Sequence, residues 1–222
     1  MQTQRPLVYE VPHKAIRNLL SQLSLEAGKA DYNKKSDIDK LSAFLKDAVM
    51  ILNTHAEHEN NVPLKYLELK IPGSSAHDKE DHERIETEMY KIEEKFKEIS
   101  SAAGDRNSEG NNFYEQISDF HSKYLQHMLE EERVTQPLLW KNFTDEELHQ
   151  QEIEIRSSIP PGDMLVWMKY MMPASRDNVR LLMLSGIKQM APPEFFNAIM
   201  GVTKSVLSSE EYSELEKGLE KI

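Results

Sequence analysis

The chain has 222 residues, no cysteine and a formal net charge of −11. Its length allows a sizeable core in one large domain, or in one domain with a smaller appendage. Without cysteine the chain forms no disulfide, iron–sulfur cluster, thiolate zinc site or cysteine nucleophile, so a metal must use nitrogen and oxygen ligands. Basic residues are scattered among acidic ones rather than gathered in a stripe, which argues against a nucleic-acid partner.

Nothing in the sequence predicts a membrane segment. The N-terminal region holds no apolar stretch like that of a signal peptide. Apolar runs such as AVMIL and MLVWM are much too short to span a bilayer. We therefore expect a cytoplasmic protein with no membrane partner.

A first helix is predicted over residues 8–29. Its core-facing line, called the seam below, has residues spaced alternately by four and three: Tyr9, His13, Ile16, Leu20, Leu23 and Ala27. The pattern stops at Gly28. His13 therefore stands where an apolar residue is expected.

A second helix is predicted from an N-cap at Ser36 or Asp37 to about Asn61, with Pro63 breaking or loosening it. Its seam runs through Ile38, Leu41, Leu45, Ala48 and Leu52 and ends in His55 and Glu59. A histidine followed four residues later by a carboxylate thus closes an otherwise apolar line.

The third and fourth predicted helices also have polar residues on an otherwise apolar seam. The third has the seam His82, Ile85, Met89, Ile92, Phe96 and Ile99, and one step backward reaches Asp78. The fourth is predicted to begin near Asn112, with the seam Phe113, Ile117, Phe120, Tyr124, His127, Glu131, Val134 and Leu138. His127 and Glu131 repeat the histidine and carboxylate at a spacing of four.

After Phe143 the composition shifts to a charged helical segment, which closes at Pro160, Pro161 and Gly162. Three or four short helices are predicted beyond it. We therefore expect a bundle in residues 1–142 and a helical appendage in residues 143–222. The appendage is rich in methionine, which favours adaptable core packing; the alternative is a lid or a partner surface that responds to metal. The sequence names no protein partner.

The carboxylates that stand on the apolar seams predict a metal site. An ionised carboxylate in a core costs several kcal/mol unless it is compensated. Residues four apart on a helix lie on one face with Cβ atoms about 5–6 Å apart, so both side chains can reach one ion. Four consecutive helices with short connections predict an all-α, antiparallel four-helix bundle, in which facing helices build metal sites. The candidate ligands are His13, His55, Glu59, His82, His127 and Glu131.

Two ions bridged by the carboxylates would use all six candidates and leave open positions. Imidazole and carboxylate suit iron, manganese or zinc, and the histidine-rich balance favours two non-haem iron ions. A lone seam histidine such as His13 or His82 can instead be a hydrogen-bonded core residue. Asp78 and Glu132 are possible further ligands, and His58 is expected either behind the ligands or at the surface. We expect the histidines that do not lie on a seam to be exposed to solvent: His77, His121 and His149.

The stretches PHKAIRNLL, THAEHE, EDHERIE and QHMLEEERVTQPLL resemble the hemerythrin family, specifically the bacterial hemerythrin-like cation-binding domains. The resemblance covers about the first 140 residues. It implies a four-helix bundle with a non-haem di-iron centre, in which Glu59 and Glu131 bridge the irons. His13, His55, His82 and His127 would be terminal ligands.

Two departures from the oxygen-carrying members bear on function. Asp78 occupies the place of a histidine on the third helix, and Glu131 follows His127 by four residues rather than five. We therefore expect a protein that binds or senses dioxygen or another small diatomic ligand rather than a simple carrier. Two alternatives stay open: an enzyme acting on peroxide or nitric oxide, and a metal-free helical interaction module.

Overall fold

A computed structural model describes residues 5–221 of the chain. Throughout this range the regular elements are helices and none is a strand, which confirms the predicted all-α class. Within this range two compact units are present, one formed by the residues up to Glu10 with Leu19–Ser158 and the other by Val11–Asn18 with the residues from Ile159 on. The helix α1 (Glu10–Lys29) is continuous, and both of its ends belong to the first unit, so it is described there. The boundary expected between residues 142 and 143 stays a prediction.

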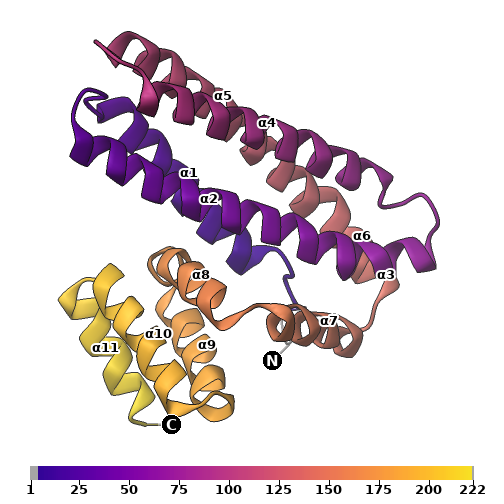
Figure 1. The fold of residues 1–222 in the computed structure, drawn as a ribbon. Coiled ribbons are helices and arrows are strands. Elements are labelled where there is room, and N and C mark those ends of the chain that lie inside the picture. The colour runs from indigo at the N-terminus through magenta and orange to yellow at the C-terminus, as the bar shows by residue number, and fades with distance from the viewer. Residues whose placement is uncertain (1–4, 222) are drawn as a thin grey trace. The chain divides into compact units, whose positions relative to one another are not determined.

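The first unit is built on four long helices that lie side by side (Figure 1). They are α1, α2 (Lys35–Asn61), α4 (Ala76–Ser101) and α5 (Asn107–Glu130). The apolar residues of the predicted seams are buried between them, for example Leu20, Leu45, Ile92 and Phe120. The bundle core therefore follows from the alternation of spacings three and four.

Two helix ends differ from the sequence prediction. The N-cap of α2 is Lys34, without a side-chain hydrogen bond, rather than Ser36 or Asp37. The carboxylate of Asp37 instead accepts a hydrogen bond from the backbone N–H of Asp31, so it stabilises the preceding turn. The helix α5 begins at Asn107, earlier than expected, because the break is confined to a short turn that contains Gly104 at a φ of +85°.

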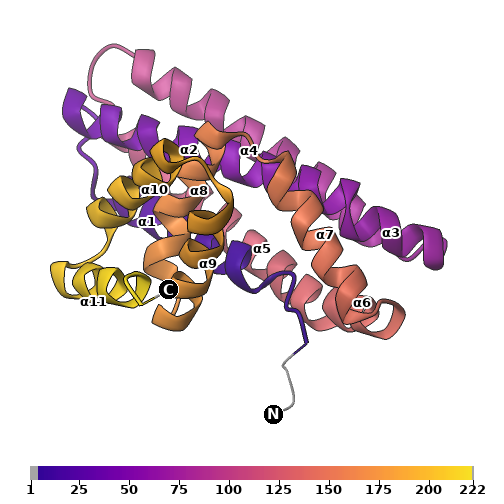
Figure 2. The ribbon, with the colours of Figure 1, turned by 90° about the horizontal axis from the view of Figure 1, so that it is seen from below.

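Three shorter helices lie toward one end of the first unit, as Figure 2 shows. They are α3 (Pro63–Lys70), α6 (Gln136–Asn142) and α7 (Asp145–Ser158). The expectation that Pro63 only interrupts a helix was incomplete: it stands in the first turn of α3, where a missing N–H is tolerated. Side chains from these helices and from the start of the chain form an apolar cluster of Tyr9, Leu67, Leu139, Phe143 and Leu148.

A π-helical turn, η1 (Glu131–Thr135), lies between α5 and α6. Because a π-turn holds more residues than an α-turn, it moves the core-facing line along the chain. Thr135 is buried, whereas the predicted seam residue Val134 is 51% exposed. The predicted seam is therefore wrong at Val134, whereas Leu138 packs against the apolar cluster, and η1 turns Thr135 toward the interior.

The second unit packs four helices around its own core: α8 (Pro161–Ala174), α9 (Asp177–Met190), α10 (Pro193–Val206) and α11 (Ser209–Leu219). The buried residues are Met168, Met172, Leu184, Ile199, Leu207, Leu215 and Leu219. Methionine as core filler is thereby confirmed for Met168 and Met172, whereas Met190 is exposed.

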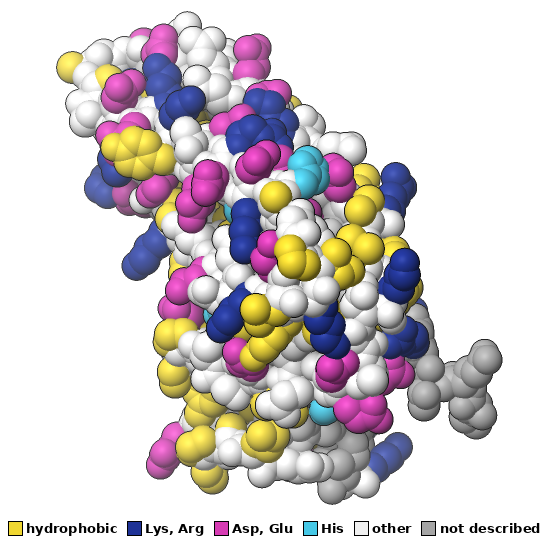
Figure 3. Space-filling view, turned by 90° about the vertical axis from the view of Figure 1, so that its right-hand side faces the viewer, with side chains coloured by type: hydrophobic (Ala, Val, Ile, Leu, Met, Phe, Trp, Pro, Cys, Tyr) yellow, Lys and Arg dark blue, Asp and Glu magenta, His cyan; other side chains and the backbone are white. Residues whose placement is uncertain are grey.

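The surface is strongly charged. On the face drawn in Figure 3, lysine and arginine side chains are interspersed with aspartate and glutamate. Among the described residues, no helix combines the length and apolarity that a bilayer crossing requires.

Candidate metal centre

All six predicted ligands are buried in the bundle, and none is more than 4% exposed. His13 comes from α1, His55 and Glu59 from α2, His82 from α4, and His127 from α5. The sixth, Glu131, is the first residue of η1. Six polar side chains therefore replace apolar ones in the bundle core.

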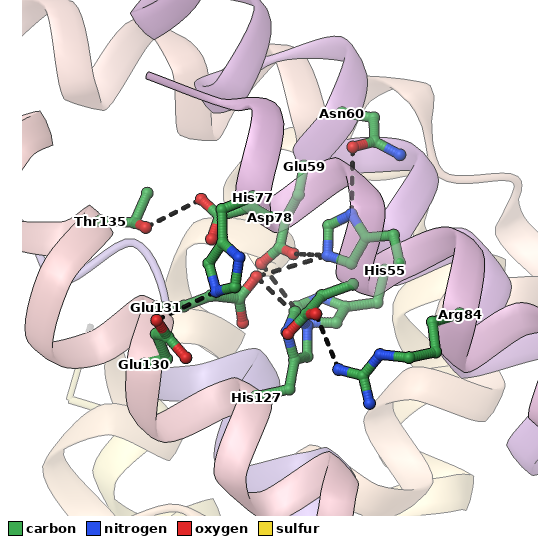
Figure 4. A network of polar contacts seen from close by, with 12 residues as sticks. His55, Glu59, Asn60, His77, Asp78, Arg84, His127, Glu130, Glu131 and Thr135 are labelled. Carbon is green, nitrogen blue, oxygen red and sulfur yellow. Dashed lines mark hydrogen bonds and ion pairs between the residues drawn. The ribbon is translucent and has the colours of Figure 1, made fainter. Parts of the chain in front are cut away.

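One cluster is formed by Glu59, His82, His127 and Glu131. Each of these residues offers one ligand atom, and the four atoms lie within 4.8 Å of one another. The Nε2 atom of His82 is 3.2 Å from Oε2 of Glu59 and 3.4 Å from Oε1 of Glu131. The Nε2 atom of His127 is also 3.4 Å from Oε1 of Glu131, and Figure 4 labels Glu59, His127 and Glu131 of this cluster.

A second cluster contains His13, His55, Glu59 and Glu131, with ligand atoms again within 4.8 Å of one another. In it, Nε2 of His55 lies 3.3 Å from Oε1 of Glu59. Both carboxylates belong to both clusters. Each cluster therefore combines two imidazoles of its own with the same two carboxylates, which fits a di-metal site.

The distances within the clusters suit a metal better than direct hydrogen bonds. Two ligand atoms that are each bound to one ion at about 2.1 Å are separated by about 3.0 Å at an octahedral angle and by about 3.4 Å at a tetrahedral angle. Charge-assisted hydrogen bonds between nitrogen and oxygen are shorter, about 2.7–2.9 Å. The buried Nε2 atoms of His82 and His127 have carboxylate oxygens nearby but lack hydrogen-bond geometry. The residues present thus fit a divalent cation.

Comparison with known families agrees with this geometry. The family model described as the hemerythrin HHE cation binding domain matches residues 8–139, more than half of the chain. The chain belongs to the hemerythrin family. The matched region holds both clusters, and α7 to α11 lie beyond it. No curated protein and no solved structure matches the chain.

The imidazoles of His82 and His127 differ in their charge in the hemerythrin domain. Burial lowers the pKa of His82, but the carboxylates of Glu131 and Glu59 outweigh burial and raise it to about 10. Burial lowers the pKa of His127, and a positive charge on His82 acts in the same direction. In the metal-free domain at neutral pH, a proton on His82 therefore stands where a metal would bind, and His127 is neutral.

Two further side chains lie behind the imidazoles of His82 and His127. The Nδ1 atom of His82 is 3.0 Å from Oδ1 of Asn60, and the Nδ1 atom of His127 is 3.6 Å from Oδ2 of Asp81. A hydrogen-bonded partner such as Asn60 turns the opposite nitrogen, Nε2, toward a metal and fixes the tautomer. Asp81 is too far from His127 for a hydrogen bond and acts on it only as a nearby negative charge. The sequence prediction missed both, because neither lies on a seam. Asp81 carried a usable signal, since it follows His77 at the same spacing of four as the two predicted motifs.

Asp78 lies in the core but in neither cluster. Its Oδ2 atom accepts a hydrogen bond of 2.8 Å from the hydroxyl of Thr135, which η1 places inward. Burial raises the pKa of Asp78 to about 6, although the bond from Thr135 opposes that rise. Neither cluster includes Glu132, the other possible ligand.

The remaining histidines have varied surroundings. His77 and His149 are exposed, as predicted. The prediction for His121 was wrong: it is half-buried, with Nδ1 3.0 Å from the hydroxyl of Ser24, and burial lowers its pKa. His58 is half-buried outside both clusters, and burial lowers its pKa as well.

Proposed function

We propose that the hemerythrin domain holds two iron ions bridged by Glu59 and Glu131. His13 and His55 would be the terminal ligands of one ion, and His82 and His127 those of the other. The observation that carries this proposal is that both clusters contain the same two carboxylates. The donor set of imidazole and carboxylate suits iron, and manganese or zinc are alternatives with the same preferences.

We further propose that this centre binds or senses dioxygen or another small diatomic ligand. Ferrous ions would supply the electrons that such a ligand accepts. Two imidazoles and two shared carboxylates would give each ion four protein ligands, fewer than the donors of a five- or six-coordinate ion, so a coordination position would remain for a ligand. Asp78 stands where the oxygen-carrying members have a histidine, and it is hydrogen-bonded to Thr135. The centre therefore has only four imidazoles, which favours sensing over simple oxygen carriage.

The surroundings of the clusters favour a small, neutral ligand. Tyr9 and Tyr124 are fully buried, and burial, followed by the negative charges of Glu59 and Glu131, holds the pKa of each well above its usual value. Both phenols therefore keep their protons and add no charge. The ring of Tyr124 packs edge-on against His127 with centroids 5.6 Å apart. Such walls exclude bulk water and large substrates.

One observation favours an enzyme as the second candidate. A carboxyl group whose pKa is about 6, as Asp78 has, can exchange a proton near neutral pH. Turnover of peroxide or nitric oxide would need such a group. Steady-state consumption assays separate the two functions, because a binding protein uses at most one equivalent of ligand per site, whereas an enzyme continues.

Elemental analysis, combined with an absorption spectrum after reduction and exposure to air, tests the main proposal. We expect about two irons per chain and charge-transfer bands in the near-ultraviolet and visible range. A protein without metal, or with one zinc that resists exchange, would contradict the proposal. The chain would then be better described as a helical interaction module with structural histidines.

A further inference from the structure

A third group of possible metal ligands lies outside the buried clusters. It consists of His77 and Asp81 on α4 and Glu130 on α5, whose ligand atoms lie within 4.8 Å of one another. His77 Nε2 is 3.0 Å from Oε1 of Glu130, and Figure 4 shows this pair beside the buried residues. The side chain of His77 is 60% exposed and that of Glu130 is 39% exposed, so solvent reaches the group.

The outer group has the same two kinds of donor as the buried clusters, with one imidazole fewer. One imidazole and two carboxylates suit ferrous, manganous or zinc ions. His77 and Asp81 repeat the spacing of four that joins His55 to Glu59 and His127 to Glu131. Three protein ligands, with water completing the coordination, should bind a cation more weakly and exchange it faster than the buried clusters.

Asp81 connects the outer group to the buried one. Its Oδ2 atom lies 3.6 Å from Nδ1 of His127, whose Nε2 atom faces Glu131. Its Oδ1 atom accepts a hydrogen bond of 2.7 Å from Nη2 of Arg84, a side chain that is half exposed. A cation bound at Asp81 would have to compete with this guanidinium.

We propose that His77, Asp81 and Glu130 form an outer, exchangeable site for a divalent cation, and that this site loads the buried centre. Cation binding at the outer site stands by itself, whereas the loading role rests on the proposed function. The physical reason for loading is access: the buried ligands are at most 4% exposed, so an incoming ion must lose most of its water on the way in. If the outer residues first replace some of the water molecules around the ion, the ion loses its hydration shell in two steps instead of one.

Binding is tested on the full chain by titration with Mn²⁺, with free Mn²⁺ measured by electron paramagnetic resonance. The protein is used both as purified and after saturation with iron. We expect one weak additional Mn²⁺ per chain in the wild type. In the double variant His77→Ala with Glu130→Gln, its affinity should fall at least tenfold; Asp81 is left intact because it contacts His127. Equal Mn²⁺ binding by this variant and the wild type would overturn the outer site.

A matched control is available on α7. His149 and Glu152 also pair across one exposed helix face, with Nδ1 and Oε2 3.4 Å apart and side chains 62% and 34% exposed. The variant His149→Ala with Glu152→Gln should bind Mn²⁺ as the wild type does. Arg84→Gln should tighten the weak site, since it removes the competing guanidinium.

Loading is tested by following the rate at which limiting Co²⁺ fills metal-free protein, monitored by absorption. The His77 and Glu130 double variant should fill several-fold more slowly than the wild type and the α7 control, but reach the same final stoichiometry. Equal rates would overturn the loading role. If the wild type never fills a buried centre, the proposed function fails and the loading role fails with it, while the Mn²⁺ titration still decides whether the outer site exists.

Discussion

The Nδ1 atom of His82 lies 3.0 Å from the amide Oδ1 of Asn60, the residue that follows Glu59. The amide oxygen can only accept a hydrogen bond, so Nδ1 of His82 donates it, and the lone pair of Nε2 becomes available to the cluster when His82 loses its second proton. Asn60 therefore fixes the tautomer and the angle of one proposed ligand without touching the metal.

Replacement of Asn60 by alanine should weaken metal binding about 10–100-fold, the usual cost of losing such an orienting partner. The measurement is competition with a chelator of known affinity. Asn61→Ala, at the exposed neighbouring position, serves as the control and should retain wild-type affinity. Unchanged affinity in Asn60→Ala would show that packing alone orients His82.

The stability of the metal-free protein should fall as the pH rises from 6.5 toward 10. The pKa of His82 is about 10 in the folded state, against 6.5 as the ordinary value, because the carboxylates of Glu131 and Glu59 outweigh burial. The stabilisation from this proton is complete below pH 6.5 and is lost as the pH approaches 10. Melting temperatures at pH 6.5 and 9 with a chelator present should show the fall.

Bound metal should remove this pH dependence, since a ligating imidazole carries no proton at Nε2. The metal-loaded protein should keep its melting temperature over the same range and should release metal in acid, as the histidines protonate. The variant His82→Gln should flatten the profile of the metal-free protein. A rise in the stability of the metal-free wild type between pH 6.5 and 9 would disagree with the assigned charge on His82.

Thr135→Val should lower the free energy of unfolding by about 1–3 kcal/mol, because it removes the donor to the buried carboxyl of Asp78. The pKa of Asp78 should then rise above its value of about 6, since the hydrogen bond from Thr135 lowers it. Urea denaturation of the metal-free protein at pH 8 measures the change. Thr135→Ser keeps the hydroxyl and should lose much less stability than the valine variant, whereas equal losses would assign the effect to packing.

Gly110 of α5 and Gly186 of α9 should respond to alanine in opposite directions. A Cβ atom at Gly110 would lie 2.2 Å from Cδ2 of the buried Tyr32 ring, so Gly110→Ala should destabilise the fold by about 1–3 kcal/mol. Nothing lies within 4 Å of a Cβ atom at Gly186, and alanine there should stabilise the helix by up to about 1 kcal/mol. Denaturation midpoints of both variants check the two signs.

The bundle and the clustering of its polar residues follow from the sequence because periodicity carries the necessary information. Alternating spacings of three and four put His55 and Glu59 on the same line as Leu45 and Leu52, which forces them into the core. Four helices with such lines have one simple way to bury them. The structure accordingly brings all six predicted residues into two clusters that share their carboxylates.

Features that do not depend on hydrophobic periodicity could not be predicted from the sequence. The π-turn at Glu131 changes backbone hydrogen bonding, which periodicity does not report, so the α-helical seam was continued to Val134 instead of Thr135. Asn60 and Asp81 lie beside the seams and reach the imidazoles only through the three-dimensional packing of α2, α4 and α5.

The central claim, that two ions share Glu59 and Glu131, is tested most directly by metal stoichiometry in two adjacent variants. Glu131→Gln removes one shared carboxylate, whereas Glu132→Gln changes a residue that belongs to neither cluster. We predict two irons per chain in the wild type and in Glu132→Gln, and at most one in Glu131→Gln. Two tightly bound irons in Glu131→Gln would contradict a centre built on shared carboxylates.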